Sequence, residues 1–333
     1  MRGAAGGGVA AQRPVVAVEA AAGALAIAFS AILFRLAHVS PSTGAFFRSL
    51  YAVPALMLIV YVQHRRAPAA AAERRERVLA ALAGVWLGVD LIVWNHAIDA
   101  IGAGLATVLG NTQVVMVALA AWVLWGERPS QRTVLAGLAV LVGVVLISGV
   151  IGASAYGARP GAGVAFGVAT GIAYTGYLLF LRQSGRSRGS AAALCDATAA
   201  CALTCLVAGA ALGDLDLTPG WRATGWLVVL ALTSQVLGWL LITVSLTRLP
   251  AALTAITLTL QPVATVIFGA IILGESPSSW QIAGVAVILA AVLAASSGRR
   301  VSAAPVADPA APAVPGIPAR PRLGGRTGPP SSR

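Results

Sequence analysis

The residue of this chain best suited to chemistry is Asp90, an acid in the middle of the long apolar segment LAGVWLGVDLIVWNHAI. A charged side chain at the centre of a bilayer costs about 2.5–3.5 kcal/mol on insertion scales, so it needs a partner, a water-filled cavity or a function. At helical spacing Asp90 shares one stripe with Trp86 and Trp94. We expect this stripe to form the wall of a ligand site, with Asp90 exchanging protons. A structural carboxylate paired with another polar group is the alternative.

Further polar and aromatic residues could complete this site. Thr107 and Asn111 lie one helical turn apart, as do Gln235 and Trp239. Tyr174 lies about one turn after Gly171. Amide and hydroxyl groups could bind a polar ligand. Packing between helices is an equal alternative for Asn111, and packing or interface anchoring is the favoured alternative for Tyr174, Gln235 and Trp239. The predicted substrate-binding residues are therefore Asp90, Trp94, Thr107, Asn111, Tyr174, Gln235 and Trp239.

Breaks in apolar helices are a second indicator of a binding site. Gly110 could loosen its helix locally, and Pro262, which follows Gln261, removes a backbone hydrogen bond. We expect helix interruptions at Gly110 and at Gln261–Pro262. Glu19, near the start of the first apolar segment, is a second proton-relay candidate, although contact with the membrane interface is the favoured reading.

The composition indicates an integral membrane protein. Apolar residues make up 58% of the 333 residues and charged residues 10%, and the mean hydropathy is +0.85, whereas soluble domains carry about 25% charged residues. The length allows about ten spans of ~20 residues, with no room for a large soluble domain. The predicted spans are 15–36, 43–63, 78–98, 103–125, 132–151, 161–181, 190–212, 223–246, 251–273 and 280–297.

The net charge of +12 does not indicate nucleic-acid binding. All 23 basic residues are arginines, and almost all lie in predicted loops and tails. With a cytoplasmic N-terminus, only Arg35, Arg159 and Arg222 fall in outside segments, as the positive-inside rule requires. We therefore expect a multi-pass protein of a bacterial plasma membrane, with both termini in the cytoplasm and no nucleic-acid partner.

The chain contains an internal repeat. Ala103–Pro129 aligns without a gap with Ala251–Pro277, which pairs Gln113 with Gln261 and the two Gly-Glu dipeptides with each other. An odd number of spans in each copy would invert the second copy. We predict an all-α integral membrane protein with ten transmembrane helices in two inverted-topology five-helix repeats. Its expected parts are a flexible N-terminus (1–14), the first repeat (15–151), the second repeat (152–297) and a disordered tail rich in Pro, Ala, Gly and Arg (298–333).

The same alignment pairs Arg48 with Asp196. Opposite charges at repeat-related positions suggest an ion pair or two gate residues. Both residues lie close to a span end, so snorkelling to the membrane interface is the favoured alternative.

Glycines spaced by four residues, at 84 and 88 and at 163, 167 and 171, allow helix backbones to approach closely. Packing within the chain is the favoured use, and a homodimer is the alternative. Cys195, Cys201 and Cys205 are expected to pack rather than to bind a metal. No phosphate-binding loop, metal-binding spacing or nucleophile elbow occurs, so we expect neither an enzyme nor a cofactor.

The repeated block resembles the EamA-type repeat of the drug/metabolite transporter superfamily. It reads NTQVVMVALAAWVLWGERPSQRTVLAGLAVLVGVVLIS and TLQPVATVIFGAIILGESPSSWQIAGVAVILAAVLAASS. Arg48, within AFFRSLYAVPAL, also resembles the arginine commonly found early in that family's second span. The resemblance implies a ten-helix inverted-repeat carrier with alternating access. The first copy departs from the family pattern, because Val114 stands where a proline is usual.

We therefore expect a secondary transporter for a small metabolite, such as an amino acid, a related polar metabolite or a cationic drug-like compound. Proton-coupled export or exchange would follow from rocking of one repeat against the other. The alternative is a membrane-embedded protein without transport activity, such as a lipid-modifying enzyme or an assembly partner. A channel is disfavoured because the mid-span acid occurs in one repeat only.

Overall fold

The computed structural model describes residues 7–66, 74–126, 131–147, 151, 156–184, 190–241 and 251–297. These residues form helices and short connections, and no strand occurs among them. The expected disordered tail at 298–333 and Glu127 of the first Gly-Glu dipeptide lie outside the described residues.

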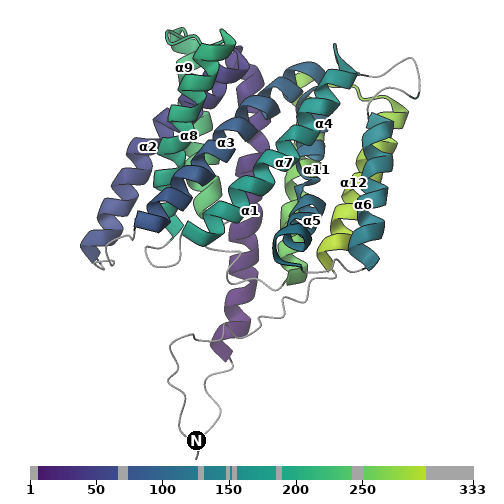
Figure 1. Ribbon diagram of the computed structural model, residues 1–333, viewed down its shortest axis with the longest axis horizontal. Helices are drawn as coiled ribbons and strands as arrows, with labels where there is room; N and C mark the ends of the chain where they lie inside the picture. Colours follow the sequence, from purple (N-terminus) through teal and green to yellow (C-terminus); the bar gives the residue numbers. More distant parts are fainter. Residues whose placement is uncertain are drawn as a thin grey trace, which may run out of the picture. The chain divides into compact units, whose positions relative to one another are not determined.

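The helices follow one another with short connections (Figure 1). They are α1 (Gly7–Ala37), α2 (Pro41–Arg66), α3 (Arg74–Ile101), α4 (Ala103–Gly110), α5 (Gln113–Trp125), α6 (Gln131–Ile147), α7 (Pro160–Ser184), α8 (Ser190–Leu212), α9 (Trp221–Leu230), the π-helix η1 (Ala231–Gly238), α11 (Ala251–Leu273) and α12 (Ser279–Ser297).

Six helical stretches among the described residues are long and apolar enough to cross a membrane. They are Pro41–Arg66, Arg74–Ile101, Ala103–Leu124, Pro160–Leu181, Ala191–Leu212 and Trp221–Leu241. Four shorter apolar stretches lie at Ala21–Ala37, Val134–Ile147, Leu260–Leu273 and Ser279–Ala294. Each predicted span thus overlaps an apolar helical stretch, and six of these stretches are long enough to cross a membrane.

Helix α1 begins at Gly7, within the region 1–14 that we expected to be flexible. Residues 1–6 lie outside the described residues, and the flexibility of this region stays a prediction. The residues that follow Gly7 are mainly alanine and valine, with a single proline at 14. Alanine has the highest helix propensity of all residues, so the helix extends several residues before the predicted span.

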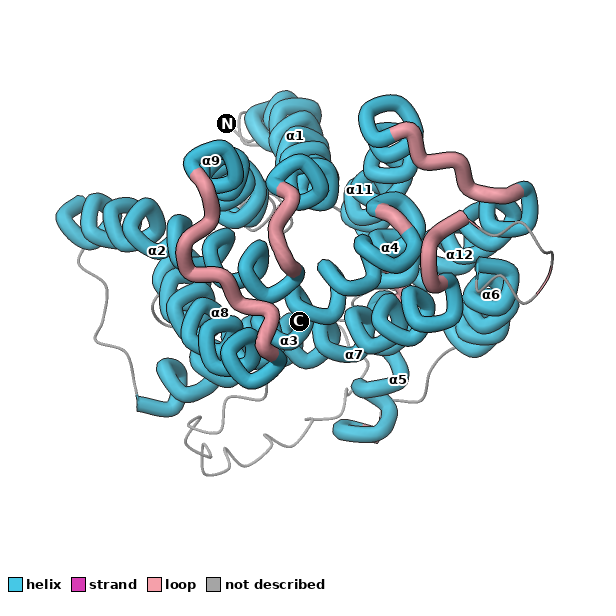
Figure 2. Tube along the Cα trace, turned by 90° about the horizontal axis from the view of Figure 1, so that it is seen from above, coloured by secondary structure: helices cyan, strands magenta, loops and turns pink. Residues whose placement is uncertain are grey.

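Helix α3 packs between α7 and α8 (Figure 2). Its glycines face α8, where a Cβ added to Gly84 would lie 2.5 Å from the Cβ of Ala200. The glycines of α7 pack in the same way against Ile101 and Leu109. These close contacts are therefore used within the chain, and the homodimer alternative loses the surfaces on which it depended.

Two pairs of repeat-related helices, α6 with α12 and α2 with α8, lie in contact and run in opposite directions. At the start of α12, Gln281 Nε2 donates a hydrogen bond to the carbonyl of Ile147 at the end of α6 (3.3 Å). At the start of α2, Ser42 contacts Gly209 near the end of α8. Each of these helices thus begins beside the end of its repeat-related counterpart.

A glycine ends each of the two repeat-related helices α5 and α11. Gly126 and Gly274 follow α5 and α11 with φ angles of 70° and 66°. This left-handed conformation favours glycine, which commonly stands directly after the end of a helix. Gly126 and Gly274 therefore act as helix stops at repeat-related positions.

Candidate functional site

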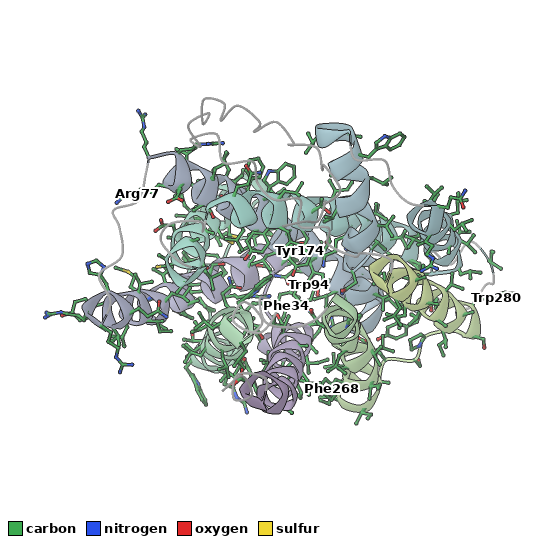
Figure 3. The ribbon with its side chains drawn as sticks, turned by 90° about the horizontal axis from the view of Figure 1, so that it is seen from below. Phe34, Arg77, Trp94, Tyr174, Phe268 and Trp280 are labelled. Carbon is green, nitrogen blue, oxygen red and sulfur yellow. The ribbon has the colours of Figure 1, made fainter. Side chains whose placement is uncertain are left out.

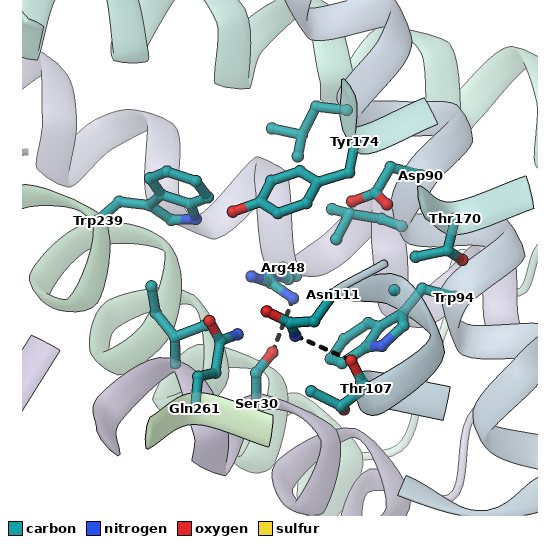
Figure 4. Close-up of a pocket in the computed structure, with 14 residues that line it drawn as sticks. Ser30, Arg48, Asp90, Trp94, Thr107, Asn111, Thr170, Tyr174, Trp239 and Gln261 are labelled. Carbon is teal, nitrogen blue, oxygen red and sulfur yellow. Dashed lines mark hydrogen bonds between the residues drawn. The ribbon is translucent and has the colours of Figure 1, made fainter. Parts of the chain in front are cut away.

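A small cavity in the interior of the helix bundle collects most of the predicted site residues (Figure 4). Its volume is about 60 Å³, which is room for only a few water molecules. It is lined by Ile27, Ser30, Arg48, Leu87, Asp90, Leu91, Trp94, Thr107, Gly110, Asn111, Thr170, Tyr174, Trp239 and Gln261. All predicted substrate-binding residues except Gln235 are among them. Trp94 and Tyr174 accordingly lie near the middle of the bundle, whereas Arg77 and Trp280 lie at its edge (Figure 3).

Arg48 is the main donor of the cavity. Its side chain is only 5% exposed, and Nη1 donates to Ser30 Oγ at 2.7 Å. Nε donates to Gln235 Oε1 at 3.2 Å, and the guanidinium carbon lies 5.9 Å from the centroid of the Trp94 ring. The expectation that Arg48 snorkels to the interface is wrong, because its donors find partners inside the bundle.

Gln235 lies one layer behind the cavity. It is fully buried, accepts from Arg48, and donates through Nε2 to Thr198 Oγ1 at 3.3 Å. We expected Gln235 to touch the substrate. The structure instead places it where it orients the Arg48 guanidinium.

Asp90 brings an acidic side chain into the same cavity. Its side chain is 7% exposed, and within the described residues its buried Oδ1 has no hydrogen-bond partner. Neither does the buried hydroxyl of Thr170, which also lines the cavity. No ion pair within 4.0 Å joins Asp90 to Arg48 in the part of the chain that the structure describes. An acceptor without a partner in the protein is available for a ligand.

An aromatic wall closes one side of the cavity. The Trp239 ring lies edge-on to Tyr174, with centroids 6.1 Å apart, and edge-on to Tyr177, with centroids 5.4 Å apart. The two tyrosines are stacked at 5.8 Å. Our sequence reasoning missed Tyr177, although its position three residues after Tyr174 puts both side chains near one helix face.

The first helix interruption falls beside Gly110, as predicted. Helix α4 ends at Gly110, Asn111 and Thr112 form a turn, and α5 begins at Gln113. Asn111 Nδ2 donates to the carbonyl of Thr107 at 2.9 Å. Side-chain donors of this kind compete with helical amides for the carbonyls, which favours a break. Asn111 therefore turns into the cavity, while Gln113 is buried just beyond the break.

The second interruption lies elsewhere than expected. Helix α11 runs without a break through Pro262, whereas η1 widens the helix that carries Gln235. In η1, Ser234 Oγ donates to the carbonyl of Ala26 in α1 at 2.9 Å. Short π-helical segments are rare and occur frequently at functional sites. Gln261 lines the cavity from the unbroken α11.

Asp196 and Glu19 do not line the cavity. Asp196 lies beside a separate pocket with Tyr61 and His64, between α2 and α8. The structure therefore does not bring Arg48 and Asp196 together around one pocket. Glu19 is half-buried on α1.

Comparison with known proteins identifies the chain. The model of the EamA-like transporter family matches residues 16–149 and again residues 161–297, and no curated protein matches the sequence. One solved structure, described only as "Crystal structure of protein", is similar with a TM-score of 0.57 and 15% sequence identity, covering 85% of this chain and 98% of its own. That likeness shows a shared fold alone.

The two family matches confirm the resemblance seen in the repeated block, and with six membrane-length helices they indicate a multi-pass membrane protein. Members of this family are transporters. Because the two matches together cover most of the chain, the protein belongs to the EamA-like transporter family.

Proposed function

We propose that this protein is a secondary transporter that carries a small zwitterionic metabolite, such as an amino acid, by alternating access. The observation that supports this most is the cavity that holds both a guanidinium and a carboxylate. Both family copies line it: Arg48 and Asp90 come from the first, and Trp239 comes from the second. Binding sites of inverted-repeat carriers lie at such an interface.

The charges of the cavity favour one substrate class among those expected. A carboxylate group would pair with Arg48, which presents a planar fork of donors. An ammonium group would pair with the free Oδ1 of Asp90, and the ring of Trp94 or Tyr174 would pack against the substrate body. A purely cationic compound fits less well, because the buried Arg48 would repel it.

The size of the cavity requires a conformational change. A volume of about 60 Å³ is well below the ~300–1,000 Å³ of ligand pockets. The described state is therefore contracted around the site. Substrate entry would need the two halves to separate, as alternating access demands.

The antiparallel contacts support inverted topology. Repeat-related helices α6 and α12 meet end to start, as do α2 and α8. Ten spans then place both termini in the cytoplasm of a bacterial cell, in agreement with the arginine distribution. In this orientation the turn at Gly274 faces outward.

Proton coupling would run through Asp90. Its free oxygen could carry a proton in one state and bind the substrate ammonium in the other, so that proton and substrate exchange on one group. Export or exchange in which a proton enters as the substrate leaves would follow.

The test is counterflow in proteoliposomes loaded with a pool of unlabelled amino acids, with labelled amino acids added one at a time. We expect at least one amino acid to accumulate, and its methyl ester, which lacks the carboxylate, to compete poorly. Arg48→Gln should abolish the preference for the free acid, whereas Arg35→Gln, which changes a half-exposed arginine, should not. Equal competition by acid and ester in the wild type would refute the proposed substrate class.

A further inference from the structure

At one end of the bundle the carboxylate of Glu275 caps the start of α4. Oε1 accepts a hydrogen bond from the amide of Ala103 at 2.5 Å, and Oε2 accepts one from the amide of Gly104 at 3.1 Å. Glu275 is 7% exposed. Helix N-termini carry unpaired amides and a partial positive charge, so a carboxylate at this place makes strong, charge-assisted bonds.

Three glycines make the space for this carboxylate. A Cβ added to Gly102 or to Gly269 would come within 2.8 or 2.5 Å of its oxygens, and a Cβ on Gly104 within 3.4 Å. Gly102 also has a φ of 87°, a conformation that a larger residue rarely adopts. The amide of Glu275 donates to the carbonyl of Gly269 at 3.1 Å, which orients the side chain toward α4.

The contact joins the two family copies. Glu275 follows α11 in the second copy, and α4 belongs to the first. One turn below the capped amides, α4 carries Thr107, whose hydroxyl donates to the carbonyl of Ala103 at 2.8 Å. Thr107, Gly110 and Asn111 then line the cavity. A movement of the capped end of α4 therefore moves the cavity wall.

We propose that Glu275 is a latch that holds α4 against α11 while this end of the transporter is closed. Opening of this end breaks both hydrogen bonds and releases α4 with its cavity residues. The inference rests on the alternating-access function proposed above. Glu275 acts on the substrate only through α4, so it is a positioning residue.

A neighbouring side chain provides a matched control. Gln281 Oε1 accepts from the amides of Tyr156 (2.8 Å) and Ser278 (3.0 Å), and Nε2 donates to the carbonyl of Ile147. Gln281 thus ties the same end of the bundle together through hydrogen bonds to Tyr156, Ser278 and Ile147 rather than to α4. Burial and the nearby Glu275 carboxylate raise the pKa of the Tyr156 phenol, so Tyr156 stays neutral beside the latch.

The experiment measures access to the cavity from each face of the membrane. Thr170→Cys provides the reporter thiol, in a chain whose three native cysteines are replaced by alanine. A membrane-impermeant thiol reagent is added to one face of oriented proteoliposomes at a time. Glu275→Gln removes the charge and one acceptor, and Ala103→Pro removes one donor at a first helical position, where proline is tolerated.

We expect both variants to increase labelling from the Glu275 face about tenfold and to decrease labelling from the opposite face. A tenfold change corresponds to about 1.4 kcal/mol, within the value of one charge-assisted bond. Gln281→Ala should leave the ratio of the two rates unchanged. Unchanged rates in Glu275→Gln and Ala103→Pro, or an equal shift in Gln281→Ala, would overturn the latch.

The latch and the transport function can fail separately. If substrate alters the labelling ratio in the parent protein but Glu275→Gln does not, only the latch is refuted. If the reporter thiol reacts from neither face, with or without substrate, alternating access through this cavity is refuted and the latch falls with it.

Discussion

Replacement of Asp90 by asparagine separates a binding role from a structural one. The buried Oδ1 of Asp90 has no hydrogen-bond partner within the described residues, and no ion pair ties the carboxylate to Arg48. The substitution keeps the volume and removes the charge. We therefore expect folding stability to change little, because the protein loses no contact through this oxygen.

Substrate affinity should change much more. A hydrogen bond to a charged group contributes about 1.5–3 kcal/mol, which corresponds to a loss of roughly 10- to 100-fold in affinity for an ammonium ligand. Counterflow should show this loss of affinity as a higher half-saturating substrate concentration. An imposed pH gradient should no longer accelerate transport. Thermal unfolding in detergent should give a melting temperature within a few degrees of the wild-type value.

Asp99→Asn is the control, since Asp99 lies on the same helix but pairs at the surface with Arg35 at 3.2 Å. Exposed pairs contribute only about 0–1 kcal/mol, so neither affinity nor stability should change. The reasoning is wrong if Asp90→Asn lowers the melting temperature strongly while affinity is retained. That outcome would assign Asp90 a structural role.

Two further substitutions act on the support of the site. Gln235→Leu removes the acceptor of Arg48 Nε and the donor to Thr198, so both stability and affinity should fall, by about 1–3 kcal/mol for the group left unpaired. Gln183→Leu, which loses only a local hydrogen bond, is the control. Unchanged substrate affinity in Gln235→Leu would contradict the role assigned to Gln235. Gly84→Ala places a methyl group 2.5 Å from the Cβ of Ala200 and should destabilise the protein by about 1–3 kcal/mol. Gly225→Ala is the control, since nothing lies within 4 Å of the added Cβ. It should be neutral or slightly stabilising in thermal unfolding. Equal changes in stability in the two glycine variants would contradict tight packing of α3 against α8.

Most of the cavity was predictable because polar groups are costly in a membrane. A polar residue far from a span end has to face the interior, so Asp90 and Asn111 could be assigned to one site from depth alone. Helical spacing then added Thr107, Trp94 and Trp239. The same logic located the break beside Gly110, where an amide side chain follows a flexible residue.

Other features depend on partners far apart in the sequence. Arg48 lies close enough to a span end to snorkel, and its burial depends on Ser30 and Gln235, which stand 18 and 187 positions away. The hydropathy of a segment indicates how deep a residue lies in the membrane, but not which residues of other helices it contacts. The π-helix η1 has the composition of an ordinary α-helix, and its register depends on contacts such as the Ser234 bond to α1. Neither the burial of Arg48 nor the π-helical register of η1 can be predicted from one segment of the sequence alone.

The two repeats supply different chemistry to one cavity. In the repeat alignment Asp90 matches Gly238 and Arg48 matches Asp196, so both cavity charges come from the first copy. The aromatic wall of Tyr174 and Trp239 comes from the second copy. The helix interruptions are also unequal, since the break after Gly110 matches a continuous part of α11. Two inverted copies with equal lining would bind a substrate equally well in either orientation. Under the proposed function, the unequal lining would bind a zwitterion in one orientation only, so both of its charged groups would stay with the first repeat while access moves from one face to the other.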